Sequence, residues 1–139
     1  MEPVTARVVV ADDNPSMTGA LKVVLEIWGW EVIVAHDGMA AVTAVREAHP
    51  TAALIDIGLP KLDGLEVARL LRAEGAAPRL MVALSGYGEE GDRRRSRQAG
   101  FDTHLVKPID PEVLRTTLAS VRSRGSSEHM PGPDARARL

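Results

Sequence analysis

The sequence contains no cysteine, and this absence excludes several classes of function at once. A chain without thiols has no disulfide framework, no thiolate zinc site and no cysteine nucleophile. Phe, Trp and Tyr together make up only 3% of the residues, which is too few for an aromatic platform that stacks nucleic-acid bases. The side chains left for chemistry are carboxylates, hydroxyls, histidines and lysines.

The chain also lacks a strong charge of either sign and a long apolar run. Seventeen basic and nineteen acidic residues leave a formal net charge of -2 at pH 7, so charge does not favour nucleic acid or an anionic membrane as a direct partner. No apolar run approaches the roughly 20 residues that cross a bilayer. Residues 1–13 lack the basic start and long apolar core of a signal peptide. We therefore expect a cytoplasmic protein.

Short apolar runs alternate with helical patterns along the chain. The predicted strands are residues 7–11, 31–35, 52–56, 79–84 and 103–106, and the predicted helices are residues 16–28, 39–48, 62–73, 89–99 and 112–123. This alternation predicts an α/β fold in which helices cover both faces of a parallel sheet. A length of 139 residues favours one domain, which we place at residues 1–124. Residues 125–139 are rich in Gly, Pro, Ser and charge and are expected to form a flexible tail.

Polar side chains stand where four of the predicted strands end. The first strand is followed by Asp12 and Asp13, the third ends in Asp56, the fourth ends in Ser85 and the fifth is followed by Lys107. Ligands of open parallel sheets bind beyond the carboxyl ends of the strands, where these residues are expected to meet. Clustered carboxylates repel one another, and a cation among them relieves that repulsion.

The types of these side chains point to a magnesium ion and a phosphoryl group. An oxygen-only ligand set favours a hard cation such as Mg²⁺. Its expected ligands are the carboxylates of Asp12, Asp13 and Asp56 and the backbone carbonyl of Gly58. Asp56 is the candidate nucleophile that forms an aspartyl-phosphate. Lys107 and the Ser85 hydroxyl are expected to bind the remaining phosphoryl oxygens.

The same motifs carry a resemblance to a known family. Asp12-Asp13, "IDIGLPKLDG" around Asp56, "ALSG" with Ser85 and "VKP" with Lys107 occur in one order and spacing over residues 7–124. In these motifs the chain resembles the receiver domain of two-component response regulators, and it looks most like receivers attached to hybrid histidine kinases. No kinase or phosphotransfer domain is attached here, so we expect a single-domain protein.

The resemblance implies several properties beyond the motifs. The fold is expected to be the flavodoxin-like (βα)5 sandwich with strand order 2-1-3-4-5. The phosphoryl donor is expected to be a histidine kinase or a histidine phosphotransfer protein, and the downstream target a protein that binds the fourth helix, fifth strand and fifth helix. The peptide bond between Lys107 and Pro108 is expected to be cis.

The chain departs from the family's pattern near the expected switch. The family often has an aromatic residue three positions before the lysine, and this chain has His104. We expect His104 to move together with Ser85 as a modified switch, against the alternative that it is a passive strand residue. Tyr87 follows the "ALSG" motif and is a candidate gate to the phosphoryl site.

The fourth predicted helix is unusual in its charge. Its sequence "DRRRSR" offers little apolar surface, so this helix should pack weakly and move easily. Arg93, Arg94, Arg95 and Arg97 form either a solvated face or a docking patch for an acidic partner surface.

Three other functions stay open at this point. A phosphorylation-independent interaction module would have the same fold with a vestigial site. A magnesium-dependent phosphatase of the haloacid dehalogenase type would carry a second carboxylate two residues after its nucleophile, where this chain has Gly58. A flavin-binding protein would need a phosphate-cradling loop where this chain has Asp12 and Asp13. We expect no enzyme with a turnover substrate, because the predicted chemistry acts only on Asp56 itself.

Overall fold

The computed structural model describes residues 6–86 and 90–127. The strands are β1 (Arg7–Ala11), β2 (Glu31–Ala35), β3 (Ala52–Asp56), β4 (Leu80–Ser85) and β5 (Thr103–Val106). The helices are α1 (Pro15–Ile27), α2 (Gly38–Ala48), α3 (Gly64–Glu74), α4 (Glu90–Ala99) and α5 (Pro111–Ser127). Every strand and helix expected from the alternating pattern is therefore present.

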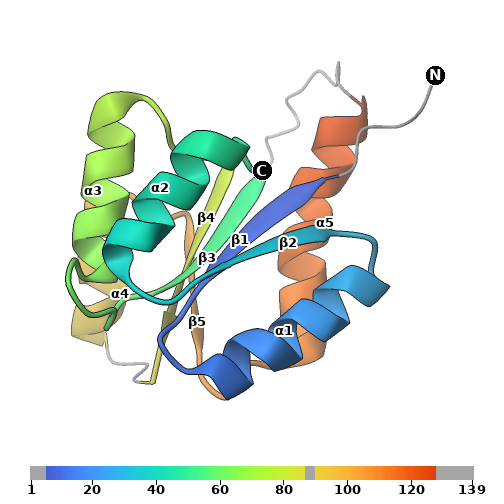
Figure 1. Ribbon diagram of the computed structural model, residues 1–139, viewed down its shortest axis with the longest axis horizontal. Coiled ribbons are helices and arrows are strands. Elements are labelled where there is room, and N and C mark those ends of the chain that lie inside the picture. The colour runs from blue at the N-terminus through green and yellow to red at the C-terminus, as the bar shows by residue number, and fades with distance from the viewer. Residues whose placement is uncertain (1–5, 87–89, 128–139) are drawn as a thin grey trace.

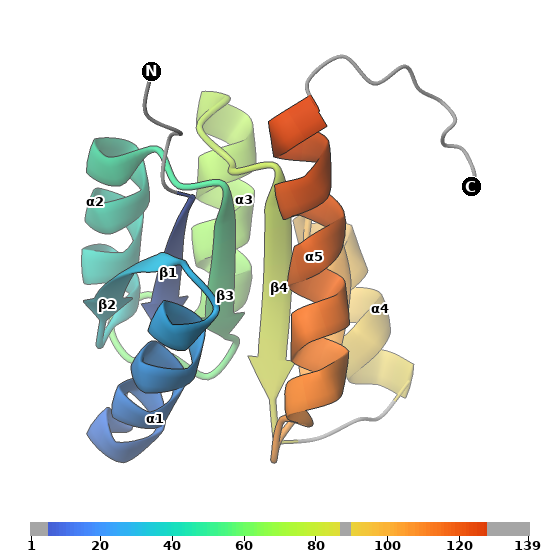
Figure 2. The same cartoon turned by 90° about the vertical axis from the view of Figure 1, so that its right-hand side faces the viewer.

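The strands form one parallel sheet in the order β2-β1-β3-β4-β5. Helices α1 and α5 cover one face of this sheet, and α2, α3 and α4 cover the other (Figure 1). The turned view in Figure 2 separates α1 and α5 in front of the sheet from α2 and α3 behind it. The predicted α/β fold class, flavodoxin-like architecture and strand order are thus confirmed.

Two apolar cores lie on the two faces of the sheet. Alternate residues of β1 point into different cores: Val9 packs on the side of α2, α3 and α4, whereas Val8 and Val10 pack on the side of α1 and α5. All five residues of β3 are buried. The continuous apolar runs in the sequence have this origin, since a central parallel strand is covered on both faces.

Side chains at the helix starts explain where two helices begin. The side chain of Asn14 accepts hydrogen bonds from the amides of Ser16 and Met17 over 3.0 and 3.3 Å. Asp63 and Glu66 form a reciprocal capping box at the start of α3. These contacts satisfy amides that have no partner inside the helix.

The strand end at Ser85 is confirmed, whereas the predicted end of the last helix is not. Ser85 is the last residue of β4, and its backbone pairs in register with Val106 of β5. Helix α5 continues to Ser127, so the first three residues of the predicted tail are helical. A single glycine such as Gly125 costs a helix only about 1 kcal/mol, which does not end it. Residues 128–139 of the predicted tail lie outside the described residues.

In the described part of the chain, no helix combines the length and the apolar character that a membrane span requires.

Candidate functional site

The predicted acidic cluster forms at the carboxyl ends of β1 and β3. Asp12 follows Ala11, and Ala11 pairs in register with Ile55, the residue before Asp56. The strand order therefore sets Asp12 and Asp56 side by side. The arrowheads of β1, β3 and β4 point to this same edge of the sheet in Figure 2. Asp12, Asp13 and Asp56 each offer a carboxylate oxygen, and these oxygens lie within 4.8 Å of one another.

Backbone amides orient two of the three carboxylates. Asp12 Oδ1 accepts a hydrogen bond from the amide of Asn14 over 2.9 Å, and Asp56 Oδ1 accepts one from the amide of Gly58 over 3.1 Å. Asp12 is 1% exposed and Asp56 is 9% exposed, whereas Asp13 is exposed. The Asp56 carboxylate is thus held in place by its own turn yet keeps a small opening to solvent.

Lys107 enters the cluster from the end of β5, as the sequence predicted. Its Nζ lies 2.6 Å from Asp12 Oδ2 and 3.4 Å from Asp56 Oδ2. Burial alone would lower the pKa of Lys107, but the hydrogen bond to Asp12 and the charges of Asp56 and Asp12 outweigh it and raise that pKa above its ordinary value. Lys107 is therefore a fixed positive charge beside Asp56 at neutral pH. The Lys107–Pro108 peptide is cis, as expected.

The loop after β3 makes close backbone contacts at Gly38 and Gly64, two residues for which the sequence predicted no role. A Cβ atom at Gly38 would lie 1.7 Å from the carbonyl oxygen of Leu62, and a Cβ at Gly64 would lie 2.4 Å from the carbonyl oxygen of Asp56. Only glycine fits at either position. The amide of Gly38 also donates to the carbonyl of Pro60 over 3.1 Å. These contacts fix the loop that carries the Gly58 carbonyl.

Ser85 and His104 share one face of the sheet. In the register of β4 and β5, Ala83 pairs with His104 and Ser85 with Val106. Ala83 belongs to the core under α2, α3 and α4, so His104 and Ser85 face the same side. Both are buried, with His104 9% exposed. The expected switch pair therefore lies between the acidic cluster and α4.

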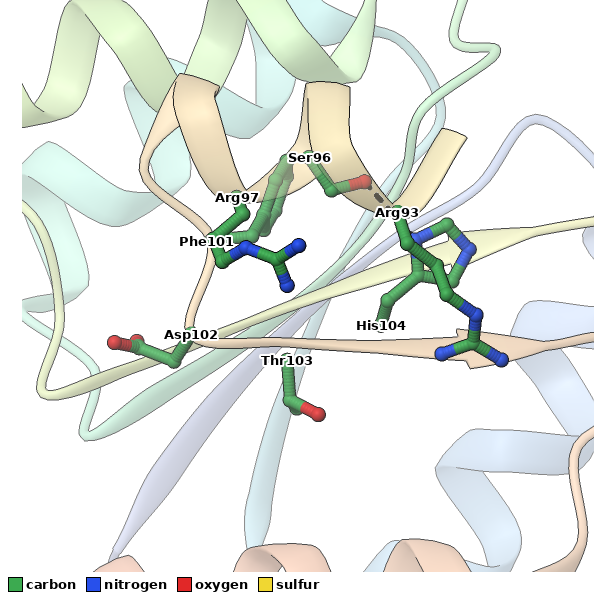
Figure 3. A pocket seen from close by; sticks show the side chains of 7 residues that line it. All are labelled: Arg93, Ser96, Arg97, Phe101, Asp102, Thr103 and His104. Carbon is green, nitrogen blue, oxygen red and sulfur yellow. Dashed lines mark hydrogen bonds between the residues drawn. The ribbon is translucent and has the colours of Figure 1, made fainter. Parts of the chain in front are cut away.

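Sequence reasoning missed the partner of His104 on α4. His104 Nδ1 lies 3.0 Å from Ser96 Oγ, drawn as a dashed line in Figure 3. Ser96 Oγ also lies 2.9 Å from the backbone carbonyl of Asp92. The Ser96 hydroxyl has one proton to donate. When it donates this proton to the Asp92 carbonyl, His104 Nδ1 must carry a proton of its own and donate it to Ser96 Oγ. The only sequence signal for this contact was a small residue within a helix of charged ones.

Two other predictions at this edge have different outcomes. The Gly58 carbonyl belongs to the turn that orients Asp56, but a Cβ at Gly58 would make only an ordinary 3.7 Å contact with Asp56 Oδ1. Close packing therefore does not demand glycine there. Tyr87, the candidate gate, lies outside the described residues, so its role stays a prediction.

Comparisons with known proteins decide the family. The family described as the response regulator receiver domain matches residues 8–119. The chain belongs to this family. It is a receiver domain of the kind found in two-component response regulators, and its acidic cluster fits Mg²⁺ binding and aspartyl phosphorylation.

The curated relatives are longer than this chain. The DNA-binding response regulator MtrA of Mycolicibacterium smegmatis is 36% identical over 124 residues, which cover 89% of this receiver domain and 52% of MtrA. The probable transcriptional regulator ycf27 of Pyropia yezoensis is also 36% identical, over 89% of this chain and 50% of the relative. The chain thus spans about half the length of the curated relatives it matches.

Solved receiver domains have the same fold. The receiver domain of Francisella response regulator 1452 has a TM-score of 0.81 and 25% identity, covering 86% of this chain and 98% of that one. The receiver domain of the sensor histidine kinase PA1611 from Pseudomonas aeruginosa has a TM-score of 0.78 and 29% identity, covering 86% of this chain and 99% of that one. That structure is described with a magnesium ion coordinated in its active site cleft.

Proposed function

We propose that this receiver domain accepts a phosphoryl group on Asp56 from a phosphohistidine, changes the position of α4 and later removes the group by hydrolysis. One observation carries the proposal: three carboxylates with oxygens within 4.8 Å of one another meet the ammonium of Lys107 at the carboxyl edge of the sheet. A charge arrangement of this kind binds and neutralises a transferring phosphoryl group.

The transfer needs little from the protein beyond position and charge. An oxygen of Asp56 attacks phosphorus, a P–O bond forms as the P–N bond of phosphohistidine breaks, and the leaving imidazole takes up a proton. The turn amide on Asp56 Oδ1 holds the other oxygen in place for attack. Lys107 turns from Asp56 to a phosphoryl oxygen, and the Ser85 hydroxyl donates to another. Hydrolysis then adds water at phosphorus and releases inorganic phosphate and the Asp56 carboxylate.

The donor set at this edge fits a magnesium ion. The proposed ligands are oxygens only: the carboxylates of Asp12, Asp13 and Asp56 and the backbone carbonyl of Gly58. Mg²⁺ held there supplies a Lewis acid that neutralises charge on the phosphoryl oxygens.

The route from Asp56 to α4 runs through two buried polar residues. Ser85 is two residues beyond Ala83, the register partner of His104, on the same face of the sheet. When Ser85 moves toward a phosphoryl oxygen, it changes the space beside His104. His104 in turn holds α4 through Ser96 Oγ, over 3.0 Å. We propose that this imidazole takes the place of the family's switch aromatic.

The proposed partners follow from the family. A histidine kinase or a histidine phosphotransfer protein supplies the phosphoryl group, and a protein that binds α4, β5 and α5 receives the signal. We propose that the domain works in the cytoplasm, makes no direct contact with nucleic acid or membranes, and has no turnover substrate beyond its own Asp56.

Intact mass measurement tests the phosphoryl chemistry. The folded protein is incubated with Mg²⁺ and acetyl phosphate or phosphoramidate, with EDTA and the Asp56→Asn variant as matched controls. We expect one phosphoryl adduct on the wild type, and none with EDTA or on Asp56→Asn, because both remove a part of the site. A stable adduct on Asp56→Asn, or an adduct that EDTA does not reduce, would contradict the proposal.

A further inference from the structure

A small pocket opens between α4 and β5, apart from the acidic cluster. It has a volume of about 150 Å³, and none of Asp12, Asp13, Asp56 and Lys107 lines it. Figure 3 shows the side chains of Arg93 and Arg97 extending from α4 toward β5, where Thr103 and His104 lie. The proposed phosphoryl chemistry leaves this pocket without a role.

The two arginines of the pocket are free to bind an anion. Arg93 and Arg97 are four residues apart on α4, so their side chains share one face of the helix. Both are exposed, and no hydrogen bond or ion pair links either of them to a residue whose side chain the structure describes. Arg95 differs, because its Nη2 lies 2.6 Å from Asp92 Oδ1. Two guanidinium groups with no ion-pair partner among the described side chains therefore line the same small pocket.

The one acidic residue of the lining does not cancel this charge. Asp102 Oδ2 accepts a hydrogen bond from the amide of Met81 over 2.7 Å and lies 3.4 Å from Nη2 of Arg72 on α3. Arg72 also donates to the carbonyl of Gly100. Asp102 is thus engaged with groups other than Arg93 and Arg97, and the pocket keeps an excess of positive charge.

The walls and the size of the pocket limit what can enter. The buried pair Ser96 and His104 lines it together with the buried ring of Phe101. A pocket of about 150 Å³ is large enough to hold one acidic side chain. The Phe101 ring is buried and offers no exposed face on which a nucleic-acid base could stack.

We propose that this pocket binds a carboxylate side chain from an acidic segment of a partner protein, with Arg93 and Arg97 as its anchors. A guanidinium donates two parallel hydrogen bonds to a carboxylate, which gives direction as well as attraction. The inference rests on the proposed function, because it takes α4 and β5 as part of the signalling face. It adds the chemistry of the partner that binds there.

A peptide titration tests the inference on the full chain without a phosphodonor. The probe is a short capped peptide of alternating Glu and Ala, and its neutral match has Gln in place of Glu. At low salt, we expect the Glu peptide to shift the side-chain Nε–H resonances of Arg93 and Arg97 in a saturable way, and the Gln peptide to leave them unchanged. Arg93→Gln/Arg97→Gln removes the charge-assisted hydrogen bonds to the carboxylate, so it should weaken binding by about tenfold or more.

A matched variant separates the pocket from general charge. Arg94→Gln/Arg69→Gln removes the same two charges from exposed residues outside the pocket lining. We expect it to weaken binding by less than about threefold, since an exposed charge that does not contact the bound carboxylate contributes little. An equal loss in both variants would overturn the inference. So would a single-stranded oligonucleotide that binds Arg93 and Arg97 more tightly than the Glu peptide does.

The phosphoryl assay keeps the two proposals apart. We expect Arg93→Gln/Arg97→Gln to lose peptide binding and still form the adduct on Asp56. A wild type that forms the adduct but does not bind the Glu peptide would overturn the inference alone. A wild type that binds the peptide through both arginines but forms no adduct would overturn the proposed phosphoryl chemistry alone.

Discussion

Helices α3 and α4 lie on the same face of the sheet and are held there by different forces. Five residues of α3 are buried: Gly64, Leu65, Val67, Ala68 and Leu71. Its start is closed by the Asp63–Glu66 capping box. In α4, among residues whose side chains are described, only Ser96 and Ala99 are buried, and Ser96 is tied to His104 by a polar contact.

The difference matches the position of each helix relative to Asp56. Helix α3 follows the loop that carries Gly58, and a stable helix keeps that loop in place. Helix α4 follows β4, the strand that ends in Ser85. A helix with little buried apolar surface can shift at a small cost in free energy. In the proposed function, the same kind of β–α unit is a rigid support in one case and a movable element in the other.

Truncation of the α3 core should have the largest effect. Leu71 is fully buried, so Leu71→Ala should lower the free energy of unfolding by about 2–5 kcal/mol. Its neighbour Leu70 is 37% exposed, and Leu70→Ala should cost less than about 1 kcal/mol. Urea denaturation of both variants measures the two costs. Equal losses would show that α3 is not held by its buried face.

Loss of the contact between Ser96 and His104 should lower the free energy of unfolding by a smaller amount. Ser96→Ala removes a buried hydroxyl that contacts His104 and the Asp92 carbonyl, which should lower the free energy of unfolding by about 1–2 kcal/mol. Ser120 is an exposed serine on α5 that donates to the carbonyl of Thr117, and Ser120→Ala should change stability by less than about 0.5 kcal/mol. If Ser96→Ala were as neutral as Ser120→Ala, the contact would not hold α4.

The smallest effect is expected from an ion pair between α2 and α3, and it should depend on pH. Arg46 Nε donates to Glu74 Oε1 over 3.0 Å. This hydrogen bond, aided by the charge of Arg46, holds the pKa of Glu74 below its ordinary value of 4.5. A lowered carboxyl pKa stabilises the fold above 4.5 and stops doing so as the pH falls through the lowered value.

A variant isolates this contribution. The stability difference between the wild type and Glu74→Gln, from urea denaturation, should favour the wild type at neutral pH and shrink toward zero in acid. A difference that grows in acid would contradict the assigned direction of the pKa change.

The sequence could predict the parts of the structure that depend on regular rules. Strand runs at regular intervals predicted the sheet, and the carboxyl ends of parallel strands meet at one edge. That rule, together with the strand order that the family resemblance implied, brought Asp12, Asp56 and Lys107 together. The capping box of Asp63 and Glu66 also follows a regular rule, because its spacing is local.

Other parts depend on packing that the sequence does not encode in a regular pattern. Helix α4 has few apolar residues, so its periodicity did not show which face meets the sheet. The Ser96–His104 contact and the arginine pocket both follow from that orientation. The close approaches at Gly38 and Gly64 join loops that are far apart in the chain, and the end of α5 depends on small local energies near Gly125.

Amide hydrogen exchange, measured before and after phosphorylation of Asp56, tests the central claim most directly. The account predicts that exchange changes in α4 and β5, at residues 90–99 and 103–106, while α3 at residues 64–74 stays as it was. Unchanged exchange in α4 on a fully phosphorylated protein, or an equal change in α3, would contradict it.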